Sequence, residues 1–108
     1  MNIKSIITGV LVTLIGVSNV IAAEYTVVIK DHQFVPSQIE MKAGEKHRLI
    51  VVNDDASPEE FESYELNREK IVSGNSKIVI FLPALEVGEY PFFGEFNPKT
   101  AQGRIVVK

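Results

Sequence analysis

The stretch that decides the fold lies near the carboxyl end and reads Gly88-Glu-Tyr-Pro-Phe-Phe-Gly-Glu-Phe-Asn-Pro-Lys-Thr-Ala-Gln-Gly103, followed by Arg104-Ile-Val-Val-Lys108. Tyr90 and Phe92 are spaced by two, and so are Ile105 and Val107, so each pair points to one face of a strand. The segment between the two strands contains residues that redirect the backbone, namely Gly94, Pro98 and Gly103. The pattern therefore predicts two strands joined by a loop that offers Glu95 and Asn97 as polar groups.

The rest of the chain repeats this alternation in short segments. Apolar residues recur at every second position in 25–30, 38–42, 47–53 and 77–82, and turn-forming residues separate these segments. No stretch has the 3.6-residue period of a regular helix. Seven or eight short strands at this spacing predict an all-β fold, and a Greek-key β-sandwich is the expected architecture.

The amino-terminal segment differs from the rest of the chain. Positive charge at Lys4 precedes an almost wholly apolar run from Ile6 to Val20, and Ala22-Ala23 supplies small residues for cleavage. The run is about 15 residues long, whereas a membrane-spanning helix needs about 20. We therefore expect residues 1–23 to be a signal peptide and 24–108 to be one exported domain without membrane insertion after cleavage. An uncleaved anchor is the alternative.

Composition limits the partners and the sources of stability. The chain has no cysteine, so no disulfide can form, and stability must come from packing alone or from packing plus a bound ion. Residues 24–108 contain 14 acidic and 10 basic side chains, a formal charge of −4. This balance argues against nucleic acid or an anionic membrane surface as a partner.

The last two strands and their loop resemble those of the cupredoxins, in which a loop of similar length carries most of the copper ligands. A blue-copper site needs a thiolate, two imidazoles and usually a thioether. On this resemblance, Gly94 stands where the cysteine belongs, Asn97 where a histidine belongs, and Ala101-Gln102 where the methionine belongs. The other histidine corresponds to about Glu59. No soft ligand remains, so blue-copper electron transfer is excluded.

A narrower resemblance covers essentially the whole of residues 24–108. The chain is similar to the small periplasmic cupredoxin-like proteins associated with bacterial high-affinity iron permeases, and to the cupredoxin-like part of periplasmic ferrous-iron uptake lipoproteins. The residues that carry the resemblance are Asp31-x-x-Phe34-x-Pro36-x-x-Ile39, Ala43-Gly44-Glu45, Glu59-Glu60-Phe61-Glu62-Ser63, Leu66, Glu69-Lys70 and Tyr90-Pro-Phe-Phe-Gly-Glu-Phe96. It implies a periplasmic protein that binds copper or iron and helps ferrous iron reach its permease. The family often has a histidine after Gly-Glu-Phe, where this chain has Asn97.

Acidic residues supply the candidate metal ligands. Residues 54–65 contain six Asp and Glu and no Lys or Arg. Like charges in one segment oppose folding, so a cation would stabilise it, although a solvated acidic rim explains the same pattern. In a cupredoxin sandwich the loop after residues 51–52 and the loop before the last strand converge at one end. We therefore predict a metal site formed by Glu59, Glu60, Glu62 and Glu95.

Strand alternation separates these glutamates without choosing between them. If Phe61 points into the core, Glu60 and Glu62 share the opposite face and Glu59 shares the side of Phe61. Both Glu59 and the Glu60/Glu62 pair thus remain candidates. His32, in the first turn, is a further candidate, with an exposed turn histidine as the alternative.

Three functions compete on these observations. The first is a metal-binding accessory protein of iron uptake that holds copper or iron and works with an iron permease or another uptake component. The second is a metal-free β-sandwich that docks a membrane transport partner through its acidic end. The third is a ferroxidase-like enzyme, for which the chain supplies no electron acceptor. Carboxylates with an imidazole suit iron, manganese or Cu(II).

Overall fold

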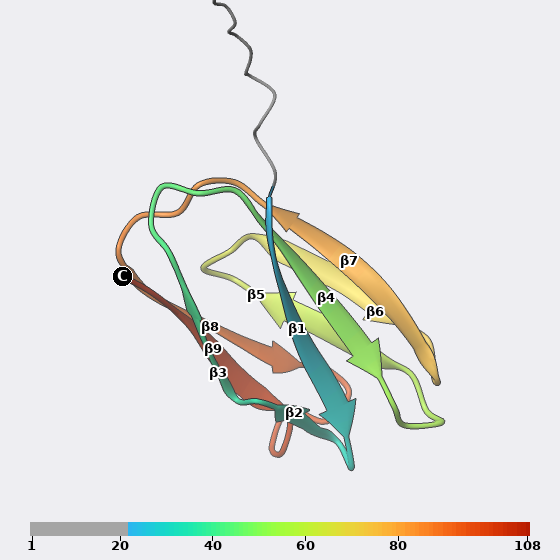
Figure 1. Ribbon diagram of the computed structural model, residues 1–108. Coiled ribbons are helices and arrows are strands. Elements are labelled where there is room, and N and C mark those ends of the chain that lie inside the picture. Colours follow the sequence, from blue (N-terminus) through green and yellow to red (C-terminus); the bar gives the residue numbers. More distant parts are fainter. Residues whose placement is uncertain (1–21) are drawn as a thin grey trace, which may run out of the picture.

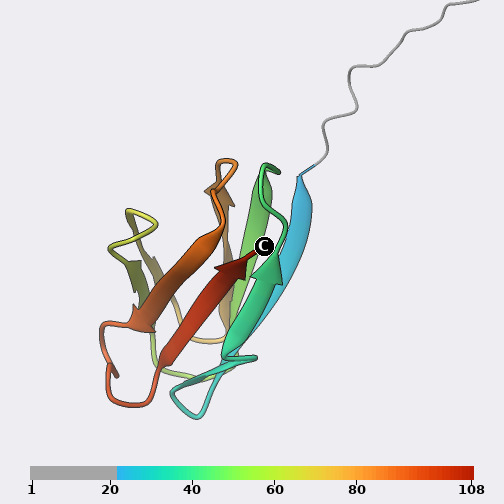
Figure 2. The same ribbon diagram turned by 90° about the vertical axis from the view of Figure 1, so that its left-hand side faces the viewer.

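The computed structural model describes residues 22–108, which form nine strands in two sheets (Figures 1 and 2). The first sheet has the order β2-β1-β4-β7 and the second has the order β3-β9-β8-β5-β6. The strand bounds are β1 Ala23–Lys30, β2 Gln33–Val35, β3 Gln38–Met41, β4 His47–Asn53, β5 Glu59–Ser63, β6 Arg68–Val72, β7 Ser76–Leu82, β8 Gly88–Gly94 and β9 Gln102–Val107. The predicted all-β sandwich is confirmed, with nine strands where seven or eight were expected.

The expected signal peptide lies almost wholly outside the described residues, so that prediction stays open. Within residues 22–108, the structure contains no helix with the length and apolar character needed to cross a membrane.

Alternating burial explains why the two sheets pack face to face. In β4, His47, Leu49, Val51 and Asn53 are buried, and the residues between them point outward. In β5 the same alternation buries Glu59, Phe61 and Ser63 and turns Glu60 and Glu62 outward. Each inner face thus presents every second residue to the other sheet, as a sandwich requires.

Three phenylalanines from three different strands form the centre of the core. Phe34 of β2 meets Phe92 of β8 edge-on, with ring centroids 4.9 Å apart, and Phe61 of β5 stacks on Phe92 at 5.0 Å. Met41 is also buried, on the same face of β3 as Ile39. Because β2 belongs to one sheet and β5 and β8 to the other, this cluster holds the sheets together.

Three connections gather at one end of the sandwich, in the lower part of Figure 1. They are the β1–β2 turn, the β4–β5 segment and the β8–β9 loop. Backbone hydrogen bonds fix the arrangement, since Asp54 donates its amide to Ile29 and Glu95 donates its amide to Glu60. The predicted convergence of residues 59–62 with residues 94–97 is confirmed.

Candidate metal centre

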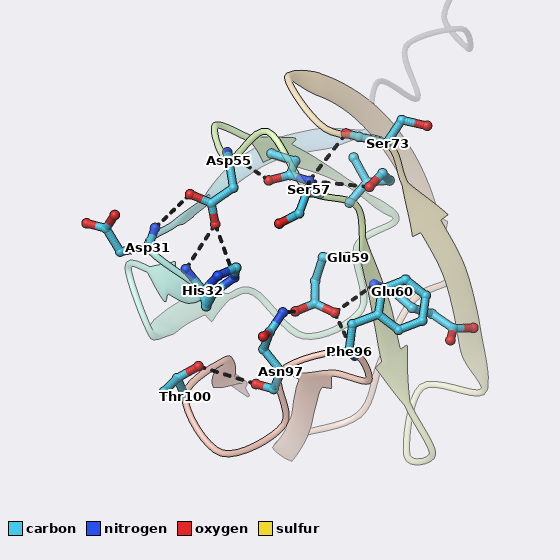
Figure 3. Close-up of polar contacts among 12 residues, drawn as sticks. Asp31, His32, Asp55, Ser57, Glu59, Glu60, Ser73, Phe96, Asn97 and Thr100 are labelled. Atoms are coloured by element: carbon cyan, nitrogen blue, oxygen red, sulfur yellow. Dashed lines mark hydrogen bonds and ion pairs between the residues drawn. The ribbon is translucent and has the colours of Figure 1, made fainter.

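Glu59 is the buried carboxylate at this end of the sandwich, with only 1% of its surface exposed. Its Oε1 accepts hydrogen bonds from the backbone amides of Glu60, at 2.9 Å, and Phe96, at 2.8 Å. Its Oε2 accepts a third from the side-chain amide of Asn97, at 3.0 Å (Figure 3). A single side chain therefore ties β5 to the β8–β9 loop.

Gly94 provides the space that Glu59 fills. A Cβ atom at position 94 would lie 2.5 Å from both Cδ and Oε2 of Glu59, and 2.8 Å from Cβ of Ala101. These separations are far below van der Waals contact, so a side chain at 94 and this position of Glu59 exclude each other. Glycine is needed at position 94 because Glu59 approaches its backbone closely and the next residues of the loop fold back over the carboxylate.

Asn97 completes this arrangement from the loop side. Besides its bond to Glu59, its backbone carbonyl accepts the amides of Thr100, at 3.2 Å, and Ala101, at 2.9 Å. Asn97 therefore closes the turn and anchors it to β5. The four positions 59, 94, 97 and 101, which the sequence comparison matched to copper ligands, do meet at one place, and hydrogen bonds occupy both carboxylate oxygens there.

A second set of carboxylates lies on the outer face of the five-stranded sheet that also contains Glu59. Glu60, Glu62 and Glu69 each offer an oxygen, and these oxygens lie within 4.8 Å of one another. The register of the β5–β6 hairpin produces this closeness, because Glu62 pairs directly with Glu69. Tyr64 borders a depression of about 220 Å³ that Glu62 and Glu69 also line, so the cluster is open to solvent. We call Glu60, Glu62 and Glu69 the outer glutamate cluster.

Crowding of like charges shifts the protonation of this cluster. Partial burial first, then a hydrogen bond and the charge of Glu69, raise the pKa of Glu60 above its ordinary value of 4.5. Partial burial and the charge of Glu69 likewise raise the pKa of Glu62, with a further contribution from Glu95. The charge of Glu62 is the main reason why the pKa of Tyr64 is also raised. These shifts share one sign because burial and neighbouring negative charges both disfavour the ionised forms.

Among residues 22–108, no ion pair within 4.0 Å involves Glu60, Glu62 or Glu69, although Arg68 lines the same depression as Glu62 and Glu69. The ion pairs in this part of the chain involve other carboxylates, on Asp55, Glu45, Glu24, Glu89 and Glu40. Glu95 approaches from the β8–β9 loop and adds a fourth negative charge close to Glu60 and Glu62. The cluster thus offers a group of oxygen ligands that take part in none of these ion pairs.

The structure therefore divides the five predicted ligands. Glu60, Glu62 and Glu95 come together on the outer side of β5, whereas Glu59 points inward and is used by hydrogen bonds. Glu69 belongs to the cluster, yet the sequence analysis did not name it as a ligand. Finding it requires the pairing register of β5 with β6, which places it opposite Glu62.

His32 lies apart from the glutamates, beside Asp55 (Figure 3). Asp31 and His32 have positive φ angles of 53° and 59°, and Asp55 accepts both of their amides at 2.9 Å through its two oxygens. His32 Nδ1 lies 3.7 Å from Oδ2 of Asp55, and 49% of the His32 side chain is exposed. In this structure Asp55 and His32 hold the β1–β2 turn against the β4–β5 segment.

Asp55→Ala is expected to lower the free energy of unfolding by about 2 kcal/mol, because two backbone amides lose a charged acceptor. The hydrogen bond from His32 is the main cause that lowers the pKa of Asp55 below its ordinary 3.8. The unfolded chain keeps that ordinary value, so this stabilisation is complete above about pH 3.8 and is lost as the pH falls further. Urea unfolding between pH 2.5 and 7 measures both effects. Asp54→Ala, an exposed neighbour, is the control, and equal losses in the two variants would contradict the role of Asp55.

Comparisons with known proteins support this architecture. In the sequence comparison, the chain is 49% identical over 84 residues to Uncharacterized protein RP394 of Rickettsia prowazekii (strain Madrid E), which covers 78% of this chain and 67% of that protein. Among solved structures, Auracyanin A, a blue copper protein from Chloroflexus aurantiacus, superposes with a TM-score of 0.70 at 12% identity, covering 81% of this chain and 99% of that one.

Two further structures have the same fold. Amicyanin from Paracoccus versutus gives a TM-score of 0.63 at 19% identity, covering 84% of this chain and 87% of that one. The metal-binding domain of the Cu(I)-exporting P-type ATPase CopA from Streptococcus pneumoniae gives 0.67 at 15% identity, covering 79% and 84%. At these identities the likeness concerns the fold alone. A family model described as a cupredoxin-like domain matches residues 5–107, and the chain therefore belongs to the family of cupredoxin-like domains.

Proposed function

We propose that this domain binds a copper or iron ion through the outer glutamate cluster and serves as a periplasmic accessory protein of ferrous-iron uptake. The observation that carries the proposal is the approach of the Glu60, Glu62 and Glu69 oxygens to within 4.8 Å of one another, with none of the three carboxylates in an ion pair among residues 22–108. A bound cation would remove the mutual repulsion that raises the pKa values of Glu60 and Glu62. Binding would therefore also stabilise the fold.

The chemistry of the ligands favours a hard or borderline ion. Carboxylates suit ferric and ferrous iron, and the general affinity order of divalent ions favours Cu(II) at almost any oxygen or nitrogen site. Carboxylates also bind Fe(III) better than Fe(II), so such a site would lower the iron potential and assist oxidation. Turnover would still need an electron acceptor from outside the chain. We therefore propose ion binding and delivery to a permease or another uptake component, with ferroxidase activity as the lesser alternative.

Support for the cellular role comes from the sequence. The apolar start followed by Ala22-Ala23 is typical of an exported protein. The Glu59-Glu60-Phe61-Glu62-Ser63 and Gly94-Glu-Phe96 motifs resemble those of cupredoxin-like proteins found with bacterial iron permeases. Fold relatives such as Auracyanin A and the CopA metal-binding domain are copper proteins by description, although this chain has no cysteine to supply a blue-copper thiolate.

Isothermal titration with Cu(II), Fe(II) and Fe(III) tests the proposal on residues 22–108, which contain all nine strands and the described core. We expect at least one ion to bind more tightly than about 100 μM, and Glu60→Gln/Glu62→Gln to weaken it at least tenfold, about 1.4 kcal/mol. Affinity should fall as the pH drops toward the raised pKa values, because carboxylates must ionise to bind. The same variant should melt at a higher temperature without metal, since repulsion is removed.

Glu40→Gln/Glu89→Gln is the matched control, because it removes two charges from the same sheet at positions paired with Lys108 and Arg104. Binding weaker than about 100 μM for every ion, or equal loss in both double variants, would reject the site. The competing function is a metal-free module whose acidic end docks a basic partner surface. Salt-sensitive association with a permease component that chelators leave unchanged would favour that alternative.

A further inference from the structure

The outer face of the sheet β2-β1-β4-β7 carries a connected group of apolar residues, although outward positions of a sandwich are ordinarily polar. The outward residues are those that alternate with the buried ones in each strand. Six of them form the surface that we call the valine face, namely Val28, Val35, Ile50, Val52, Val79 and Phe81. The valine face and the outer glutamate cluster lie on opposite sides of the sandwich, because the cluster is on the outer face of the other sheet.

Strand register makes the valine face continuous. Val28 of β1 pairs with Val35 of β2 on one side and with Val52 of β4 on the other. One register step away along the strands, Ile50 of β4 pairs with Val79 of β7. Side chains two residues apart on one strand and opposite each other on neighbouring strands are in contact range. A connected apolar path through Val35, Val28, Val52, Ile50 and Val79 therefore crosses all four strands, and the exposed Thr26 of β1 lies beside it, opposite Ile50.

Among residues 22–108, all strands outside this sheet lie on its inner side, so nothing described covers the valine face (Figures 1 and 2). Phe81 and Val35, at opposite corners, are 62% and 53% exposed. The four residues between them are half-buried by their neighbours and lie flush with the sheet. An exposed apolar surface of this continuity marks an interaction site more often than chance placement does.

Cations surround the valine face. Arg48 pairs with Phe81 in the ladder, and its guanidinium lies 5.5 Å from the centre of that ring. Lys77 pairs with Val52, and Lys30 ends β1 beside Val28. The one acidic residue among the outward positions of β1, β4 and β7 is Glu24, which is already bonded to Arg48 at 2.6 Å. The rim is therefore net positive.

Charge, size and shape argue against two simple occupants, a second copy of the chain and a membrane. A second copy that packed the same face against it would bring two positive rims together, which opposes association. From strand spacing and length, the whole outer face of this sheet measures roughly 19 by 23 Å, or about 440 Å². This area is about half the 800 Å² that each partner buries in a standard interface. A membrane would need apolar groups that reach below the headgroups, and most of this face does not protrude.

We infer that the valine face docks an acidic amphipathic helix of a partner protein. Covering the apolar face of a sheet with a helix is a common two-layer arrangement in proteins. A helix is about 10–12 Å wide with its side chains, and four turns span about 22 Å, so one helix fits along the face. Its apolar stripe would cover Ile50, Val52 and Val79, and flanking carboxylates would pair with Lys30 and Lys77, since Arg48 is already paired with Glu24.

The test is a titration of the isotopically labelled 22–108 domain with a synthetic 18-residue peptide, followed by amide NMR shifts. The peptide carries leucines at helical spacing flanked by glutamates, and a second peptide replaces every glutamate by lysine. We expect saturable shifts centred on residues 28, 50, 52 and 79, with binding at least tenfold weaker for the lysine peptide, about 1.4 kcal/mol. Doubling the salt concentration should weaken binding further.

Ile50→Thr/Val79→Thr keeps β-branched residues and should abolish these shifts, while Ile71→Thr, on the outer face of the other sheet, should leave them unchanged. The inference is overturned if the glutamate peptide causes no shifts on this face or if the lysine peptide binds equally well. It is also overturned if the face instead mediates self-association in sedimentation, or binding to vesicles of phosphatidylglycerol and phosphatidylcholine. None of these outcomes depends on metal binding by the outer glutamate cluster.

Discussion

Glu59→Ala is expected to be the most damaging single substitution in this domain, lowering the free energy of unfolding by about 3 kcal/mol. It removes the acceptor of three hydrogen bonds, donated by the backbone amides of Glu60 and Phe96 and by the side-chain amide of Asn97, and it opens a cavity next to Gly94. For a domain of this size the melting temperature should fall by roughly 15 °C. Thermal unfolding measures the loss, and amide exchange at Phe96 should become faster.

Glu60→Ala is the matched control, since its side chain starts one residue later and points outward. It should leave stability unchanged or raise it, because Glu60 contributes to the repulsion among the outer glutamates. A loss in Glu59→Ala no greater than in Glu60→Ala would contradict the assignment of Glu59 as the side chain that joins β5 to the β8–β9 loop.

Gly94→Ala should have the second largest effect, a loss of about 2–3 kcal/mol. The added methyl group would meet the carboxylate of Glu59 at 2.5 Å and Ala101 at 2.8 Å, so the loop must move. Removing the carboxylate relieves most of this clash. The double variant Glu59→Ala/Gly94→Ala should therefore be more stable than the sum of the single losses predicts, by about 1 kcal/mol or more. Urea unfolding of all four proteins completes the cycle.

Additive losses would show that the two positions do not share one space, and would contradict the geometry described for this end of the sandwich. The cycle supplies its own control, because each single variant reports the cost of its own change. The cycle also tests whether Glu59 and a copper thiolate are incompatible at this place, since any side chain at position 94, including cysteine, must compete with Glu59 for the same space.

The sequence predicted the fold well because it depends on patterns that repeat along the whole chain. Alternation in residues 25–30, 47–53 and 77–82, together with glycine and proline between strands, is enough to indicate a sandwich. The convergence of residues 59–62 with 94–97 also followed, because it depends on topology. The choice among the glutamates did not follow, since alternation separates Glu59 from Glu60 and Glu62 without showing which side offers free oxygens.

Two features could not be predicted from the sequence because they depend on the register in which the strands pair or on which face of a strand is buried. Glu69 joins the outer glutamate cluster only because the β5–β6 hairpin places it opposite Glu62, and a shift of one residue would move it to the inner face. The valine face was hidden for a related reason. In 47–53 the buried Leu49 and Val51 alternate with Ile50 and Val52, which are equally apolar, so the sequence alone does not reveal that one set lies outside.

The most direct test of the account is the position of a bound ion in a metal-soaked crystal, located by anomalous scattering. We predict a single copper or iron ion between the carboxylates of Glu60, Glu62 and Glu69, with oxygen ligands and with the Glu59–Asn97 hydrogen bond intact. An ion bound at Glu59 and Asn97 in place of that hydrogen bond, or no ordered ion at millimolar concentrations of either metal, would contradict it.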